Sequence, residues 1–154
     1  MKKIIRKVSE EDIDLLVEMY MTDVENHEQR AIEFAKDLIY RFKSIICVSN
    51  KQVFGCITWD TKGGLNDGVI ELVTLGVKPN YQRLGIAREL LLYLINEAKK
   101  FFSESGYKLR VIYLFMERSN EIAHRFYNFM GFREIAEIPS FYPHDDAKIW
   151  IKYF

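Results

Sequence analysis

The chain reads Gln82-Arg83-Leu84-Gly85-Ile86-Ala87-Arg88 where a long apolar run, residues 69–77, gives way to a helical pattern, residues 85–103. The run predicts a strand buried on both faces, and the quoted segment is the turn into the helix. A helix N-terminus carries unpaired N–H groups and the positive end of a dipole, so it attracts phosphate. Gly85 would let a phosphate approach the backbone closely, and Arg83 and Arg88 could add charged contacts. The segment is therefore either a diphosphate site or an ordinary strand-to-helix turn.

Two other kinds of phosphate loop are absent from the sequence. It contains no GxxxxGK[ST], which excludes a P-loop nucleotide enzyme. It also contains no GxGxxG after a first strand with an acidic residue about 20 positions further on, which excludes a dinucleotide-binding Rossmann site. A phosphate group at residues 82–88 would have to be bound in another way.

Outward from this turn, the apolar periodicity and the turn residues predict an alternation of strands and helices. Strands are predicted at residues 3–8, 44–49, 52–60, 69–77, 109–116, 132–138 and 147–153, and helices at about 9–21, 29–41, 85–103 and 120–130. The order is β-α-α-β-β-β-α-β-α-β-β. It indicates an α/β protein with a mixed central sheet of about seven strands and four helices on its faces.

The composition fits one globular domain that spans residues 1–154. The 22 basic residues balance the 22 acidic ones, which argues against whole-surface binding of nucleic acid or an anionic membrane. Cys47 and Cys56 lie in apolar runs and predict buried thiols, so neither a disulfide nor a metal site is expected. No apolar run reaches the ~18 residues of a membrane span, and no secretory signal is present. We therefore expect a cytoplasmic protein.

Two blocks of this sequence resemble the GCN5-related N-acetyltransferase (GNAT) superfamily. Gln82-Arg83-x-Gly85-x-Ala87 is similar to its Q/R-x-x-G-x-G/A loop, and Leu75-Gly76-Val77 to the strand that precedes the loop. The second block comprises Ser119-Asn120, Ala123, Phe126-Tyr127 and Gly131-Phe132. The resemblance implies that acetyl-CoA is the co-substrate and that Gln82, Arg83, Leu84, Gly85, Ile86, Ala87 and Arg88 bind its pyrophosphate. It also implies that Leu75, Gly76, Val77, Asn120, Ala123, Phe126 and Tyr127 contact the coenzyme.

The transfer of an acetyl group to an amine needs a base, an oxyanion site and a proton for the leaving thiolate. Tyr127 matches the thiol-protonating tyrosine of the family, although its periodicity alone favours a core residue. Glu71 is the one acidic residue within residues 69–77. Partial burial is expected to raise its pKa towards the range of a base, unless it lies at an exposed strand start. It stands six residues before Val77, as the base does in histone-acetylating members of the superfamily.

The segment Phe141-Tyr142 followed by Asp146-Ala147 resembles the substrate-binding segment of N-terminal (Nα) protein acetyltransferases of the ribosomal-protein and archaeal types. This implies that Phe141 and Tyr142 hold a substrate peptide. Phe115 departs from the pattern, because those enzymes usually carry Glu or His there. Glu71 could replace that residue, and Glu117 lies on the same strand face.

The sequence does not determine which amine accepts the acetyl group. Asp23 and Glu25 could attract a small cationic amine, such as a polyamine, an amino acid or an antibiotic amine, or a lysine side chain. They could equally belong to a solvated loop. A different class, a CoA-binding module without catalysis, would account for Phe115. The expected partners are acetyl-CoA and a peptide N-terminus or small amine, with no nucleic acid and no membrane, in a monomer or homodimer.

Overall fold

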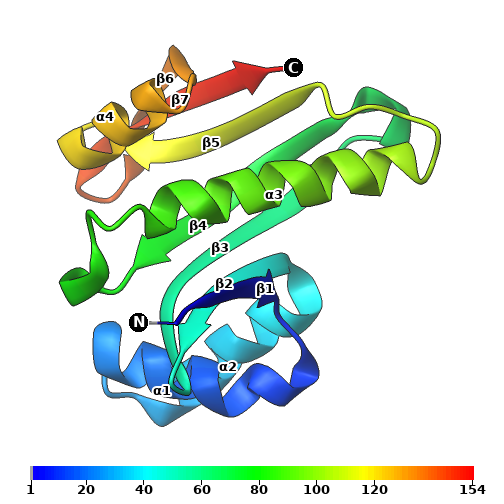
Figure 1. Ribbon diagram of the computed structural model, residues 1–154. Helices are drawn as coiled ribbons and strands as arrows, with labels where there is room; N and C mark the ends of the chain where they lie inside the picture. Colours follow the sequence, from blue (N-terminus) through cyan, green and yellow to red (C-terminus); the bar gives the residue numbers. More distant parts are fainter. Residues whose placement is uncertain (1) are drawn as a thin grey trace. The chain divides into compact units, whose positions relative to one another are not determined.

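The computed structural model describes residues 2–154, and these form two compact units (Figure 1). The first unit comprises the residues up to Asp60 together with Thr74–Glu97, and the second comprises Thr61–Val73 together with Ala98–Phe154. The strands are β1 (Ile4–Lys7), β2 (Lys43–Ser49), β3 (Gln52–Lys62), β4 (Val69–Val77), β5 (Val111–Glu117), β6 (Arg133–Tyr142) and β7 (Asp145–Tyr153). The helices are α1 (Ile13–Asp23), α2 (Glu28–Lys36), α3 (Ile86–Ser103) and α4 (Glu121–Phe129).

The seven strands are hydrogen-bonded in the order β1-β2-β3-β4-β5-β7-β6. The first half of β4 runs parallel to β5, whereas β1–β2, β2–β3, β5–β7 and β6–β7 are antiparallel. The mixed sheet with four helices, and the order of all the elements, are as the sequence predicts. No helix within residues 2–154 combines the length and apolar character that a membrane crossing requires.

In the first unit, helices pack against both faces of the β2–β3 pair. Leu16 of α1 and Ala35 of α2 share one buried cluster with Ile46 and Cys56. Gly55 faces the other way, because neighbouring residues of a strand alternate. A Cβ on Gly55 would stand 3.0 Å from a side-chain carbon of Leu90, so glycine allows α3 to lie close to β3.

Two thiols and a tight turn of the first unit follow the sequence-based expectation. Cys47 and Cys56 are buried and free, and burial raises the pKa of Cys56 to about 12.

The turn between β2 and β3 has φ values of +47° at Asn50 and +60° at Lys51. Positive φ at both central residues matches the twist of a hairpin with a two-residue connection.

In the second unit, β5 separates two environments. Ile112, Leu114 and Met116 are buried, whereas Tyr113, Phe115 and Glu117 alternate with them and are half-buried. The latter three therefore share the face of β5 that is more open to solvent. α4 packs on β7, where the rings of His124 and Trp150 stack with centroids 5.5 Å apart.

Three details differ from the sequence-based prediction. β4 is not buried on both faces, because Ile70 and Leu72 are buried but Thr74 and Gly76 are exposed. Within residues 2–154, no atom lies within 4 Å of a Cβ built on Gly76. The predicted helix at 29–41 ends as α2 at Lys36 and continues as one wider turn, Asp37–Arg41, which buries Leu38. The loop expected at 139–146 is mostly strand, since β6 and β7 pair up to the contact between Tyr142 and Asp145.

Asp12 secures the start of α1 to β1. The Arg6 guanidinium donates two hydrogen bonds of 2.8 Å to its carboxylate, and the backbone N–H of Ser9 donates a third of 2.8 Å. The hydrogen bonds from Arg6 lower the pKa of Asp12 against the opposing effect of burial. The sequence-predicted capping box of Ser9 and Asp12 is thus present, and Arg6 extends it to the strand.

We predict that Asp12→Asn lowers the free energy of unfolding at pH 7 by about 1–2 kcal/mol, because Arg6 loses a charged acceptor. The folded-state pKa lies below the unfolded value, so the stabilisation is complete above roughly pH 4 and is lost as the pH falls through the folded-state pKa. Urea unfolding at pH 7 and at about pH 2 measures this, with the exposed Asp14→Asn as the control. A deficit of Asp12→Asn that is equal at both pH values would contradict the prediction.

Candidate active site

The turn that precedes α3 has an unusual backbone conformation. Arg83 has a φ of +63° and Gly85 a φ of +82°, and α3 begins at Ile86. The first backbone hydrogen bond of the helix runs from the N–H of Glu89 to the carbonyl of Gly85, at 3.0 Å. The N–H groups at the start of the helix therefore have no acceptor within it. Such a turn, with left-handed residues before a helix N-terminus, forms a concave array of N–H donors suited to an anion.

The loop before this turn is fastened to its own unit. The Gln82 amide donates to the carbonyl of Val77 at 3.1 Å, and the ring of Tyr81 stacks on Phe54 with centroids 4.0 Å apart. The residues from Gln82 to Gly85 are nevertheless exposed. Within residues 2–154, neither Arg83 nor Arg88 forms an ion pair. The sequence-predicted phosphate loop thus combines a fixed backbone with two available guanidinium groups, which fits a diphosphate.

The second half of β4 leads directly to this loop. Leu75 and Val77 are half-buried, and the exposed Gly76 between them has open space on its side-chain position. The hydroxyl groups of Thr58 and Thr74 are 2.7 Å apart and hydrogen-bonded, which joins β3 to this part of β4. The backbone of the strand is therefore accessible at Gly76. An extended ligand that pairs with a strand needs such access.

Tyr127 is the most deeply buried of the sequence-predicted catalytic residues. It is 6% exposed, and the rings of Phe126 and Phe132 contact it edge-on at 5.1 and 5.4 Å. Burial raises the pKa of its phenol far above the ordinary value of 10. The phenol therefore keeps its proton at neutral pH, as the predicted acid role requires.

Asn120 lies at the N-terminus of the same helix. Its side-chain oxygen accepts a hydrogen bond from the N–H of Ala123 at 3.1 Å. This confirms the N-cap that the sequence predicts. The cap uses the oxygen of the amide and leaves its NH₂ group able to donate elsewhere.

Five rings form a continuous array on the open face of the second unit, here called the aromatic array. Successive centroids are 5.9, 5.3, 5.0 and 6.1 Å apart, in the order Tyr113, Phe115, Phe141, Tyr142 and His144. The structure thus brings the predicted Phe141 and Tyr142 together with Phe115 of β5. Glu71 is the register partner of Tyr113 across β4 and β5 and is half-buried. Its carboxylate forms no hydrogen bond or ion pair within residues 2–154.

Asp23 and Glu25 lie in the first unit, and both carboxylates already have partners. Asp23 accepts from the Lys78 ammonium at 2.7 Å. Glu25 accepts from the Tyr20 hydroxyl at 2.8 Å and from the Arg30 guanidinium at 2.6 Å, and these bonds lower its pKa. A cationic substrate amine would have to displace these partners.

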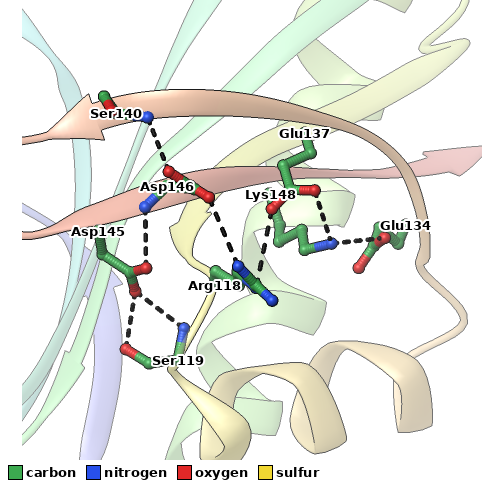
Figure 2. A network of polar contacts seen from close by, with 8 residues as sticks. All are labelled: Arg118, Ser119, Glu134, Glu137, Ser140, Asp145, Asp146 and Lys148. Carbon is green, nitrogen blue, oxygen red and sulfur yellow. Dashed lines mark hydrogen bonds and ion pairs between the residues drawn. The ribbon is translucent and has the colours of Figure 1, made fainter.

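A polar network at the β6–β7 turn is not apparent from the sequence (Figure 2). Asp145 accepts from the backbone N–H of Ser119 at 2.9 Å and from its hydroxyl at 2.7 Å. Asp146 accepts from the N–H of Ser140 at 2.7 Å and forms an ion pair with Arg118 at 3.6 Å. The turn that carries the end of the aromatic array is therefore fastened to the segment between β5 and α4.

The structure thus combines an α/β fold, a turn at the start of α3 that suits an anion, and a buried phenol on α4. The model of the acetyltransferase (GNAT) family matches residues 11–132. The chain belongs to this family, and it is an acetyl-CoA-dependent acetyltransferase with acetyl-CoA as its co-substrate.

Relatives and solved structures agree with this assignment. An uncharacterized N-acetyltransferase of Methanocaldococcus jannaschii is 30% identical over 152 residues, which cover 97% of this chain and 90% of that protein. The ribosomal-protein-S18-alanine N-acetyltransferase of Escherichia coli has the same fold, with a TM-score of 0.76 and 22% identity, over 99% of this chain and 94% of that chain. Arabidopsis thaliana NAA60, solved in complex with acetyl-CoA, gives a TM-score of 0.74 at 19% identity over 99% of both chains.

We predict that Gly85→Ala raises the KM for acetyl-CoA about ten-fold, because a side chain at a φ of +82° costs about 1–2 kcal/mol and shifts the N–H groups of the turn. Steady-state kinetics with varied acetyl-CoA measure the effect. Gly106→Ala is a matched control, since Gly106 has a φ of +80°, has open space around it and lies outside the loop. An equal change in KM in both variants would contradict a coenzyme role for the loop.

Proposed function

We propose that the chain transfers the acetyl group of acetyl-CoA to the α-amine of a protein or peptide N-terminus, by direct attack in a ternary complex. The aromatic array carries this proposal. It offers a surface of rings on two strands and a turn, with the carboxylate of Glu71, which has no hydrogen-bond or ion-pair partner within residues 2–154, on the strand beside Tyr113. Rings suit the backbone and side chains of a peptide, and a carboxylate suits its ammonium group.

Comparison of the two acidic regions favours a peptide over a small cationic amine. The carboxylates of Asp23 and Glu25 are engaged by Lys78, Arg30 and Tyr20. Glu71, in contrast, has no such partner within the described residues 2–154. The solved fold neighbour from Escherichia coli is a ribosomal-protein-S18-alanine N-acetyltransferase, which is consistent with a protein or peptide acceptor here.

The roles follow from the chemistry of the transfer. In this proposal the amine nitrogen attacks the thioester carbon, and a backbone N–H at Leu75 or Val77 stabilises the oxyanion. Glu71 takes the proton that the nitrogen loses as the new C–N bond forms. The C–S bond then breaks, and the neutral phenol of Tyr127 protonates the thiolate. Gln82, Arg83, Leu84, Gly85, Ile86, Ala87 and Arg88 hold the pyrophosphate, while Gly76, Asn120, Ala123 and Phe126 contact the rest of the coenzyme.

The acceptor's own pKa also favours an α-amine. An α-amine has a pKa near 8, so about a tenth of it is neutral at pH 7, whereas a lysine amine near 10.4 is almost fully charged. An α-amine therefore needs less help from a base than a lysine side chain does. A cytoplasmic location and a monomeric or homodimeric state remain predictions.

The acceptor class can be tested by thiol release from acetyl-CoA with a panel of peptides that differ in their first residue. Spermidine and an N-terminally blocked lysine peptide complete the panel. We predict turnover of unblocked peptides that depends on the first residue, and at least ten-fold lower kcat/KM for the other two amines, since both are almost fully protonated at pH 7. Turnover of spermidine alone would redirect the acceptor site to Asp23 and Glu25.

The acid role predicts that Tyr127→Phe lowers kcat by about 10²-fold while the KM for acetyl-CoA changes little, because the ring keeps its packing but loses the proton. Tyr107→Phe, at an exposed tyrosine, is the matched control. Unchanged kcat in Tyr127→Phe would show that the thiolate leaves without this phenol. Loss of coenzyme binding instead of kcat would assign Tyr127 to positioning.

A further inference from the structure

The aromatic array ends in a pair of ionisable groups. His144 lies in the turn between β6 and β7, and its Nε2 atom is 3.0 Å from Oε1 of Glu117 at the end of β5. The two residues are 27 positions apart in the sequence. Glu117 shares the open face of β5 with Tyr113 and Phe115, and His144 stacks on Tyr142. The pair therefore lies at one end of the aromatic array, which is the surface that we propose binds the acceptor.

The contact defines which atom of the imidazole can accept a proton. When Nε2–H donates to Glu117, the lone pair lies on Nδ1, and the carboxylate offsets the charge of the imidazolium that forms. This is the arrangement of a base held by an orienting acid. The other rings of the array accept no proton near neutral pH. Phe115 stands at its centre and has no acid–base chemistry at all.

The turn that carries His144 is held in place although the histidine side chain is 64% exposed. Asp145, the next residue, is bonded to Ser119, and Asp146 is bonded to the N–H of Ser140 (Figure 2). The titratable groups facing His144 are Glu117 from β5, Tyr142 from β6 and Asp145 from β7. The carboxylate of Glu117 thus lies beside the imidazole, and the exposed ring is open to solvent that can carry a proton away.

We propose that the Glu117–His144 pair takes the first proton from the acceptor ammonium. The N–H bond of the ammonium breaks, the proton bonds to Nδ1 of His144, and the nitrogen keeps the electron pair for its attack on the thioester. The imidazolium then returns the proton to water. Glu71 takes the second proton, which leaves the nitrogen after the attack. This inference rests on the proposed function, because it requires an amine acceptor at the aromatic array.

The test compares kcat/KM for an unblocked peptide at pH 7 and pH 9 in the wild type, His144→Gln and Glu117→Gln. We expect His144→Gln to lose about ten-fold at pH 7 and less than two-fold at pH 9, where the α-amine is already neutral. Glu117→Gln should show a smaller loss with the same dependence on pH. His27→Gln is the control, since His27 caps α2 in the other unit. The KM for acetyl-CoA should stay the same in all variants.

A loss in His144→Gln that is equal at both pH values would assign a purely structural role and overturn the inference. Unchanged kcat/KM at pH 7 would overturn it as well. In both cases an active wild type would leave the proposed function intact. A wild type that acetylates no peptide would overturn the proposed function, and this inference with it.

Discussion

The left-handed backbone of Gly85 is the constraint on which the candidate coenzyme site depends. At a φ of +82° Gly85 immediately precedes α3, and no atom of residues 2–154 lies within 4 Å of a Cβ built on it. The residues around it maintain this geometry: Gln82 is bonded to Val77, and Tyr81 is stacked on Phe54. Gly55 contributes from β3, because its missing side chain lets Leu90 and therefore α3 approach the sheet. Two glycines thus position the N-terminus of α3, where we propose that the diphosphate of the coenzyme binds.

Most of the fold follows from local sequence. The bounds of β4 coincide with the apolar run at 69–77, and Gly131 has the left-handed φ of +87° expected after α4. The predictions are wrong where contacts between distant parts of the chain determine burial or strand length. The apolar run predicts burial on both faces of β4, yet Thr74 and Gly76 are exposed, and no atom of residues 2–154 lies within 4 Å of a Cβ built on Gly76. The strand predicted at residues 132–138 is too short: β6 continues through Pro139 to Tyr142, since an edge strand tolerates a residue without an N–H.

The candidate site also contains features that local sequence predicts and contacts that it does not predict. The phosphate loop and the Asn120 cap are local patterns and are visible in the sequence. The contacts of Phe115 with Phe141, of Glu117 with His144 and of Asp145 with Ser119 join positions 26 or 27 residues apart. No local pattern encodes them, although the even spacing of Tyr113, Phe115 and Glu117 shows that they share a face. Likewise, the sequence leaves the role of Asp23 open, and only the fold reveals its partner Lys78, 55 residues away.

In the function we propose, Phe115 leaves the centre of the acceptor surface without an acid–base group, and the surrounding residues supply two others. Glu71 stands beside Tyr113, and the Glu117–His144 pair stands at the far end of the array. We propose that this surface receives a protein α-amine. Tandem mass spectrometry of one peptide that carries both a free α-amine and an internal lysine tests it most directly. The account predicts acetyl groups on the α-amine alone after incubation with acetyl-CoA. Acetylation of the lysine, with the α-amine left free, would contradict it.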